Sequence, residues 1–207
     1  MDVTGKRSGW FRDVEYRGAQ SGMLNSLPMT AITPPDRQQL LDVLTASGDR
    51  FRAATLTLTD TQWNHRPAPG KWSAADLAEH LALSEEVMPR LARKALSEPG
   101  PRRDEAQVRE QDAEIVASMQ DDAWHGSAVA ALQPRRSFSS GAAAGAAFLE
   151  RRARTVEYVR TTNDPLREHT FPHPAYGPLD SYQWLLMLAH HSDRHVRQIE
   201  RSVRSAS

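Results

Sequence analysis

Apolar residues repeat at spacings of three and four in four stretches of the chain, the pattern of helices that bury one face against a core. The first stretch begins at Pro34 and ends in the polar run 57–64. Two prolines follow between residues 66 and 71, and they cannot continue a helix because they lack a backbone donor. The stripe of this first predicted helix is Leu40, Leu44, Ser47, Phe51, Ala54 and Leu58.

A second stretch begins at Ser73, which stands three residues before Asp76, as in a capping box at a helix N-terminus. The proline-rich segment 99–101 ends the stretch, and Pro89 within it predicts a kink. We therefore expect a second, kinked helix. Its stripe is Leu77, Leu81, Ser84, Met88, Leu91 and Ala95.

Two further helices are predicted in the C-terminal half. An alanine-rich stretch opens at Ser139 or Ser140 and ends near Asn163. The last helix begins at Asp180, the first residue of a capping pattern, and runs to about Val203. The stripe of the third helix is Phe148, Leu149, Ala153, Val156 and Val159.

The remaining connections carry weaker patterns. Residues 101–138 contain one short predicted helix, from Arg103 to Met119, whose apolar face is thin, and we interpret it as an excursion outside the core. Residues 169–178 contain three prolines and Gly177, which predicts a rigid loop. Strand-like alternation, internal repeats and hairpin turn signals do not appear in the sequence.

These elements predict an all-α fold, a four-helix bundle with a long helix-containing connection between its second and third helices. The bundle is antiparallel or crossed over, and the connection at 101–138 could serve as the crossover. The chain of 207 residues fits one domain, over residues 34–204. Residues 1–33 show no sustained periodicity and are predicted to be a mobile extension.

Composition narrows the classes of function. With 26 basic and 26 acidic residues, the chain has no net charge to attract nucleic acid or an anionic membrane, so the expected partner is a small-molecule substrate. The absence of cysteine excludes disulfides, thiolate nucleophiles and Cys-ligated zinc. No stretch approaches the roughly 18 apolar residues of a membrane span, and residues 1–30 show no signal core, so we expect a cytoplasmic protein. A homodimer is plausible because bundles expose helix faces, although no stripe singles out an interface.

Two histidines occupy core positions of the last predicted helix, where a bundle normally places leucine. Residues four apart lie one turn from each other on the same face, so the rings of His191 and His195 can converge on one ion. His190 lies about 140° from His195 around the helix and is left out of the ligand set. The stripe of this helix is Trp184, Leu188, His191, His195 and then Gln198 or Ile199.

His80 of the second helix offers a third ligand, on the face that it shares with Ser84. Three imidazoles from two helices would leave coordination positions open to water or substrate, which is typical of a catalytic metal. The alternative is structural, because a histidine beside a core stripe is usually hydrogen-bonded and the HxxxH spacing occurs by chance in many helices. Spacing alone does not decide between these interpretations.

Three separated motifs together resemble the DinB-like superfamily, over about residues 35–203. They are Pro67-Ala-Pro-Gly-Lys-Trp-Ser73 followed by His80-Leu81, then His173-Pro-Ala-Tyr-Gly177, and His191-Ser-Asp-Arg-His195-Val-Arg-Gln-Ile199. The resemblance implies an up-up-down-down bundle whose metal is bound by one histidine of helix two and an HxxxH pair of the last helix. His80, His191 and His195 match those positions.

The resemblance also implies a class of chemistry. Characterised relatives include metal-dependent transferases and isomerases that use low-molecular-weight thiols such as mycothiol or bacillithiol. For this chain we therefore expect a divalent ion, zinc or nickel before iron or manganese, that activates such a thiol. One alternative is a metal-dependent hydrolase in which Glu79, Glu85 or Glu86 assists water bound to the metal. The other is a non-catalytic, metal-stabilised binding module.

Three residues are candidates to line the pocket: Trp72, Ser84 and Trp184. Either tryptophan could instead belong to the core, with Trp72 packing the entry of the second helix. Arg194 is expected to pair with a carboxylate on the surface, or to bind the carboxylate of a thiol cofactor. His173 is expected to be a hydrogen-bonding loop residue rather than a fourth ligand. None of these residues is assigned a catalytic role.

Overall fold

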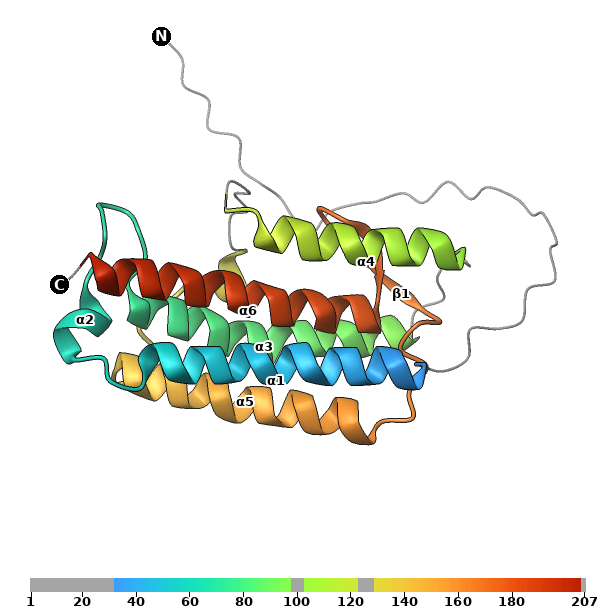
Figure 1. Ribbon diagram of the computed structural model, residues 1–207, viewed down its shortest axis with the longest axis horizontal. Coiled ribbons are helices and arrows are strands. Elements are labelled where there is room, and N and C mark those ends of the chain that lie inside the picture. Colours follow the sequence, from blue (N-terminus) through green and yellow to red (C-terminus); the bar gives the residue numbers. More distant parts are fainter. Residues whose placement is uncertain (1–31, 98–102, 123–128, 206–207) are drawn as a thin grey trace, which may run out of the picture.

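The computed structural model describes residues 32–97, 103–122 and 129–205 (Figure 1). Of the predicted N-terminal extension, all but residues 32 and 33 lie outside the described residues. The described elements, in chain order, are α1 (Pro34–Thr55), α2 (Asp60–Asn64), α3 (Ala74–Ser97), α4 (Glu105–Gln120), the 3-10 helix η1 (Ala130–Leu132), α5 (Gly141–Thr161), β1 (Thr170–His173), β2 (Gly177–Asp180) and α6 (Ser181–Arg204).

Short-range sequence signals define where the bundle helices begin. The hydroxyl of Thr33 caps α1, directly before two prolines. Ser73 and Asp76 exchange hydrogen bonds at the start of α3, and Asp180 forms a capping box with Gln183 at the start of α6. The predicted starts of these helices are confirmed.

The direction of the four long helices differs from the prediction. In Figure 1, α1 and α6 run one way, whereas α3 and α5 run the other. Gln39 and Arg50 of α1 contact Tyr182 and Asp193 of α6 in the same order along both helices, so those two are parallel. The up-up-down-down order is therefore wrong, and the order is up-down-down-up.

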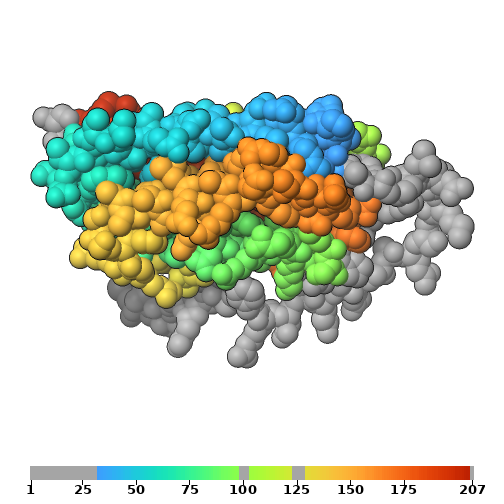
Figure 2. All heavy atoms as spheres, turned by 90° about the horizontal axis from the view of Figure 1, so that it is seen from below, coloured from blue at the N-terminus to red at the C-terminus, as the bar shows by residue number. Residues whose placement is uncertain are grey.

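The connections explain this order. Among the connections between the four long helices, only the one from α3 to α5, which contains α4, carries the chain back along the length of the bundle. The consecutive helices α3 and α5 are therefore parallel. The predicted crossover role of this connection is thereby confirmed. Figure 2 shows the face on which α5 lies between α1 and α3, and α5 packs against both.

Helix α4 belongs to the core, contrary to the prediction of an excursion. It packs along α6 (Figure 1), and the side chains of Val108, Ile115 and Met119 are at most 3% exposed. Polar contacts also hold this helix, so it packs against α6 in spite of its thin apolar stripe. Asp112, for example, binds the buried guanidinium of Arg167 at 2.8 Å.

The segment predicted as a rigid loop forms a small antiparallel hairpin. Strands β1 and β2 pair Thr170 with Asp180 and His173 with Gly177. Each strand has only four residues, and together they contain two prolines, so the sequence shows no alternation that would reveal them. Gly177 has a positive φ of 70°, which glycine adopts without strain.

Two clusters of buried apolar side chains fill the bundle. Along α6, residues as far as Ala189 join the first cluster and residues from Val196 join the second, so His191 and His195 occupy the stretch between them. None of the helices within the described residues combines the length and apolar character that crossing a membrane requires.

Candidate metal centre

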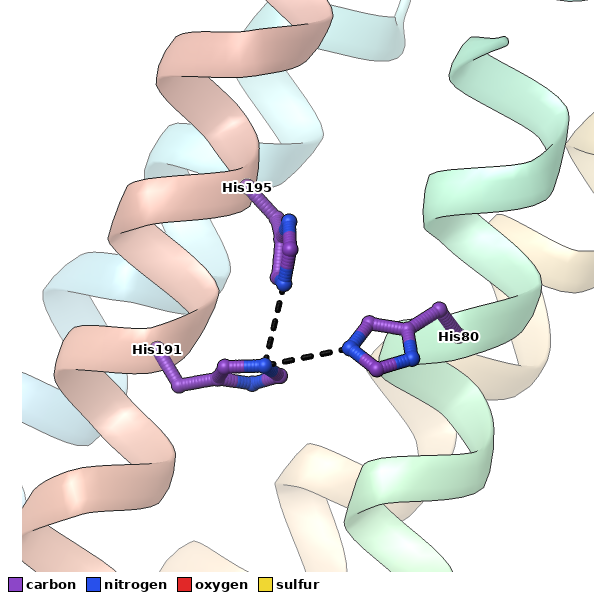
Figure 3. A group of neighbouring side chains, drawn as sticks. All are labelled: His80, His191 and His195. Atoms are coloured by element: carbon purple, nitrogen blue, oxygen red, sulfur yellow. Dashed lines mark hydrogen bonds between the residues drawn. The ribbon is translucent and has the colours of Figure 1, made fainter. Parts of the chain in front are cut away.

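Three histidines from two helices converge inside the bundle (Figure 3). His191 and His195 lie one turn apart on α6, and His80 faces them from α3. Nε2 of His191 lies 3.1 Å from Nε2 of His80 and 3.0 Å from Nε2 of His195. One ring nitrogen from each histidine lies within 4.8 Å of the other two. The fold thus brings together the three residues that the sequence nominated as ligands.

Hydrogen bonds at the outer ring nitrogens orient two of the three imidazoles. Nδ1 of His80 donates to the carbonyl oxygen of Leu132 at 2.7 Å, and Nδ1 of His195 donates to Oε1 of Gln198 at 2.8 Å. Because a carbonyl oxygen can only accept, both neutral rings carry their proton on Nδ1. Each Nε2 therefore has a lone pair, as a metal ligand requires.

His191 differs from its two neighbours. Its Nδ1 is buried and has no hydrogen-bond partner among the described residues. With its proton on Nε2, the ring can donate toward His80 and His195; with its proton on Nδ1, it presents a third lone pair to the same point. A buried donor without a partner costs about 1 to 3 kcal/mol, so binding an ion at Nε2 has to offset this cost.

Burial holds the pKa of all three imidazoles below the usual value of histidine. Burial, followed by the charge of His80, lowers the pKa of His195 to about 3. Burial and the two neighbouring histidines lower the pKa of His191 well below 6.5, and burial also lowers the pKa of His80. The rings are uncharged at neutral pH, the state in which imidazole binds metal.

The donor set fits a divalent ion such as zinc. Nitrogens bound to zinc at about 2.0 to 2.1 Å in a tetrahedral site are about 3.3 Å apart, close to the separations of 3.0 and 3.1 Å in the cluster. Within the described ranges, no acidic side chain joins the three histidines. Three protein ligands with a remaining position are typical of catalytic rather than closed structural sites.

Glu79, one candidate base, is engaged with the backbone. Its carboxylate accepts the N–H groups of Arg135, Arg136 and Ser137 at 2.9 to 3.0 Å. Burial by itself would raise the pKa of Glu79, but these donors outweigh it and hold the pKa below its usual value. Both carboxylate oxygens therefore point at the backbone and not at a substrate.

The other two candidate bases have cationic partners. The fully buried carboxylate of Glu85 binds Nε of Arg152 at 2.5 Å. Glu86 is partly exposed, and it binds Arg90 at 2.7 Å and Arg151 at 3.4 Å. Neither is among the groups that cluster with the histidines.

The three pocket candidates lie in different environments. Trp72 is half-buried, and its ring centroid lies 4.9 Å from that of His80, so it packs directly against the histidine cluster. The hydroxyl of Ser84 is buried and donates to the carbonyl oxygen of His80 within α3. Trp184 is 4% exposed in the first apolar cluster, and its Nε1 has no partner among the described residues.

Other predicted residues lie outside the cluster. His190 is half-buried and is not part of the group of three, as predicted. Nδ1 of His173 accepts hydrogen bonds from the backbone N–H groups of Ala175 and Tyr176, which fits a hydrogen-bonding hairpin residue. Arg194 is buried rather than on the surface, and it donates to the backbone carbonyl of Asp121.

Sequence reasoning missed the partners that orient the ligands. Gln198 lies three residues after His195, so helical spacing could have identified it. Leu132 contributes only its backbone carbonyl, which no side-chain pattern reveals. Its position depends on how the connection after α4 returns to α3.

Comparison with known proteins agrees with this fold. A profile of the DinB superfamily matches residues 43–199, a range that includes all three histidines. The uncharacterized protein YuaE of Bacillus subtilis (strain 168) is 25% identical over 143 residues, which cover 69% of this chain and 84% of YuaE.

Two solved structures share the fold. YfiT from Bacillus subtilis, described as a probable metal-dependent hydrolase with an unusual four-helix bundle topology, aligns with a TM-score of 0.57 and 18% identity over 86% of this chain and 92% of its own. TT2238, described as a four-helix bundle protein, aligns with a TM-score of 0.50 and 19% identity over 80% of this chain and 98% of its own. The predicted four-helix bundle is confirmed.

Proposed function

This chain belongs to the DinB superfamily, and from that premise we propose that it is a metal-dependent enzyme that activates a low-molecular-weight thiol. The reaction is of the S-transferase or isomerase type, on a small electrophilic substrate in the cytoplasm. The divalent ion, zinc or nickel before iron or manganese, is held by His80, His191 and His195.

The observation that carries this proposal is the convergence of three imidazole nitrogens, two with lone pairs fixed by their tautomer, and no carboxylate of the described residues lies beside them. When bound, the ion supplies Lewis acidity that lowers the pKa of a sulfur or oxygen nucleophile. The protein contributes neutral ligands, fixed ring orientations and the aromatic ring of Trp72 beside the cluster.

The engaged glutamates favour a thiol over water as the nucleophile. Glu79, Glu85 and Glu86 are held by backbone or cationic partners, so none of them is free to accept a proton next to His80. On a zinc ion a coordinating thiol would be deprotonated outright, whereas bound water would keep a pKa of about 7, so the thiol depends less on such a base. Since the chain has no cysteine, the thiol comes from a small molecule.

A second candidate function is hydrolysis, because the solved structure of YfiT is described as that of a probable metal-dependent hydrolase. In that case the same three histidines hold the ion and water is the nucleophile. A third candidate is a binding module in which the ion only stabilises the fold.

The metal site is tested by elemental analysis of protein purified without chelator. We expect about one divalent ion per chain, lost in the His191→Ala, His195→Ala double variant. His190→Ala is the matched control, since this histidine is adjacent to the cluster but outside it, and that variant keeps the ion. If the wild type holds no ion even after incubation with zinc or nickel, the proposed site is wrong.

The reaction class is tested with a panel of low-molecular-weight thiols and a chromogenic electrophile, run beside ester and amide substrates. Turnover that needs both the ion and a thiol supports the proposed function. Ion-dependent turnover of esters or amides without a thiol supports the hydrolase. A stably bound ion with no turnover on any of these substrates supports the binding module.

A further inference from the structure

We propose that Glu79 is a positioning residue for the ligand His80. By anchoring the backbone of residues 135–137, Glu79 holds the carbonyl oxygen of Leu132 against Nδ1 of His80. This fixes the tautomer in which Nε2 offers a lone pair to the cluster. The inference rests on the proposed metal site and adds the device that orients one of its ligands.

The first support is the set of hydrogen bonds around the carboxylate. Glu79 is 4% exposed, and its Oε1 accepts from the N–H groups of Arg135 at 3.0 Å and Ser137 at 2.9 Å. Its Oε2 accepts from the N–H group of Arg136 at 2.9 Å. Three successive backbone donors directed at one anion form a strong, charge-assisted contact.

The second support is the backbone conformation of this segment. Arg136 has a positive φ of 58°, a left-handed conformation that a residue with a side chain rarely adopts. This turn aims three consecutive N–H groups at the same point, as in other backbone anion sites. The hydrogen bonds to Glu79 offset the disfavoured conformation, so the segment depends on the carboxylate for its shape.

The third support is the short stretch of chain between the residues that Glu79 binds and Leu132, which binds His80. Leu132 ends η1, which packs against α3, and its carbonyl oxygen lies 2.7 Å from Nδ1 of His80. Arg135 follows only three residues later. Two adjacent residues of α3 thus bind the same returning segment, one as anchor and one as metal ligand. Loss of the anchor frees the carbonyl oxygen that holds the imidazole.

The test uses Glu79→Gln, which keeps the size of the side chain. The amide retains one oxygen for two of the donors, but its NH₂ group meets the third N–H as donor against donor. We expect the affinity for zinc to fall about 10-fold, the low end of the roughly 10- to 100-fold losses that follow when a partner of a ligand histidine is removed. Competition with a chromophoric chelator measures this affinity.

Two readouts separate positioning from a general loss of stability. In chelated protein, ¹⁵N NMR should find the proton of His80 on Nδ1 in the wild type and distributed over both nitrogens in Glu79→Gln. Hydrogen exchange at the amides of 135–137 should accelerate in the variant. The matched control is Glu150→Gln on α5, where an exposed glutamate pairs with Arg154, and it should leave all three measurements unchanged.

The outcomes distinguish this inference from the proposed function. If the wild type binds zinc and Glu79→Gln binds it equally well with the same His80 tautomer, the positioning role is wrong and the metal site stands. If the wild type binds no ion, the proposed function fails. The tautomer of His80 in the chelated protein still decides whether Glu79 positions this ring.

Discussion

Two polar clusters are buried along α3 and α6, and they differ in whether the protein completes them. The first surrounds Arg152 of α5, whose side chain is 3% exposed. The second is the cluster of three histidines. Both place polar atoms in the interior of a helical bundle, where each unmet hydrogen bond is costly.

The Arg152 cluster is closed. Its guanidinium donates to Glu85 at 2.5 Å, to the hydroxyl of Ser192 at 2.7 Å, to the carbonyl oxygen of Leu44 at 2.9 Å and to the hydroxyl of Ser47. These partners come from α1, α3 and α6, so all four bundle helices meet at one cation. The carboxylate of Glu85 also accepts from Thr155 at 2.8 Å.

The histidine cluster is open. Its outer nitrogens have partners at His80 and His195, but three inner nitrogens face one another and Nδ1 of His191 has no partner among the described residues. A closed buried cluster holds the helices that supply its partners in one arrangement. An open one leaves ring nitrogens available to water or to the proposed ion.

The largest expected effect comes from opening the closed cluster. Glu85→Ala leaves the charge of Arg152 buried without its carboxylate, which should lower the free energy of unfolding by about 3 to 5 kcal/mol. Urea denaturation of chelated protein measures this. Replacing the pair with apolar side chains, Glu85→Leu with Arg152→Met, should recover most of the loss. A loss below about 1 kcal/mol for the single variant would show that the pair is not structural.

The next largest effect is expected when zinc binds the histidine cluster. Zinc at about 1,000 times its dissociation constant should raise the free energy of unfolding of the wild type by about 4 kcal/mol, because the ion binds only the folded site. The His191→Ala, His195→Ala variant should gain nothing. Equal stabilisation of both proteins by zinc would place the ion elsewhere.

A smaller effect is the pH dependence of the open cluster in chelated protein. The pKa values of His191 and His195 lie well below 6.5 in the folded state, so below pH 6.5 the unfolded chain takes up protons that the folded chain does not. Stability is therefore lost as pH falls, by about 1.4 kcal/mol for each of these imidazoles one unit below pH 6.5. Denaturation from pH 7.5 to 5.5 should show that the free energy of unfolding falls more in the wild type than in the double alanine variant. An equal pH dependence of the free energy of unfolding in both proteins would contradict this expectation.

The smallest effect is expected at a surface pair next to the histidine cluster. Arg50 of α1, 52% exposed, binds Asp193, which lies between His191 and His195 in sequence. Arg50→Ala should change the free energy of unfolding by less than about 1 kcal/mol and leave zinc affinity unchanged, because exposed pairs contribute little. Weaker zinc binding in this variant would show that the metal site depends on this surface pair.

Much of the site could be predicted because its chemistry is local in sequence. The spacing of four between His191 and His195 and the exclusion of His190 follow from helical periodicity. The choice of His80 as third ligand rested on its place beside the core stripe of another helix and on the resemblance to the DinB-like superfamily. The roles of the glutamates could not be predicted in this way. Glu79 and Glu85 are buried beside partners that are 56 or more residues away in sequence, and no local pattern reports such contacts.

The sequence by itself determined the four long helices, their caps and the pairing of His191 with His195, because apolar periodicity, helical spacing and capping act over a few residues. The meeting of His80 with this pair depends on how α3 packs against α6. Only the tertiary structure decided that α3 and α5 are parallel, that α4 joins the core, and that the connection after it brings Leu132 to His80. These features depend on packing between distant segments. The same packing closes the cluster around Arg152 and leaves the histidines open.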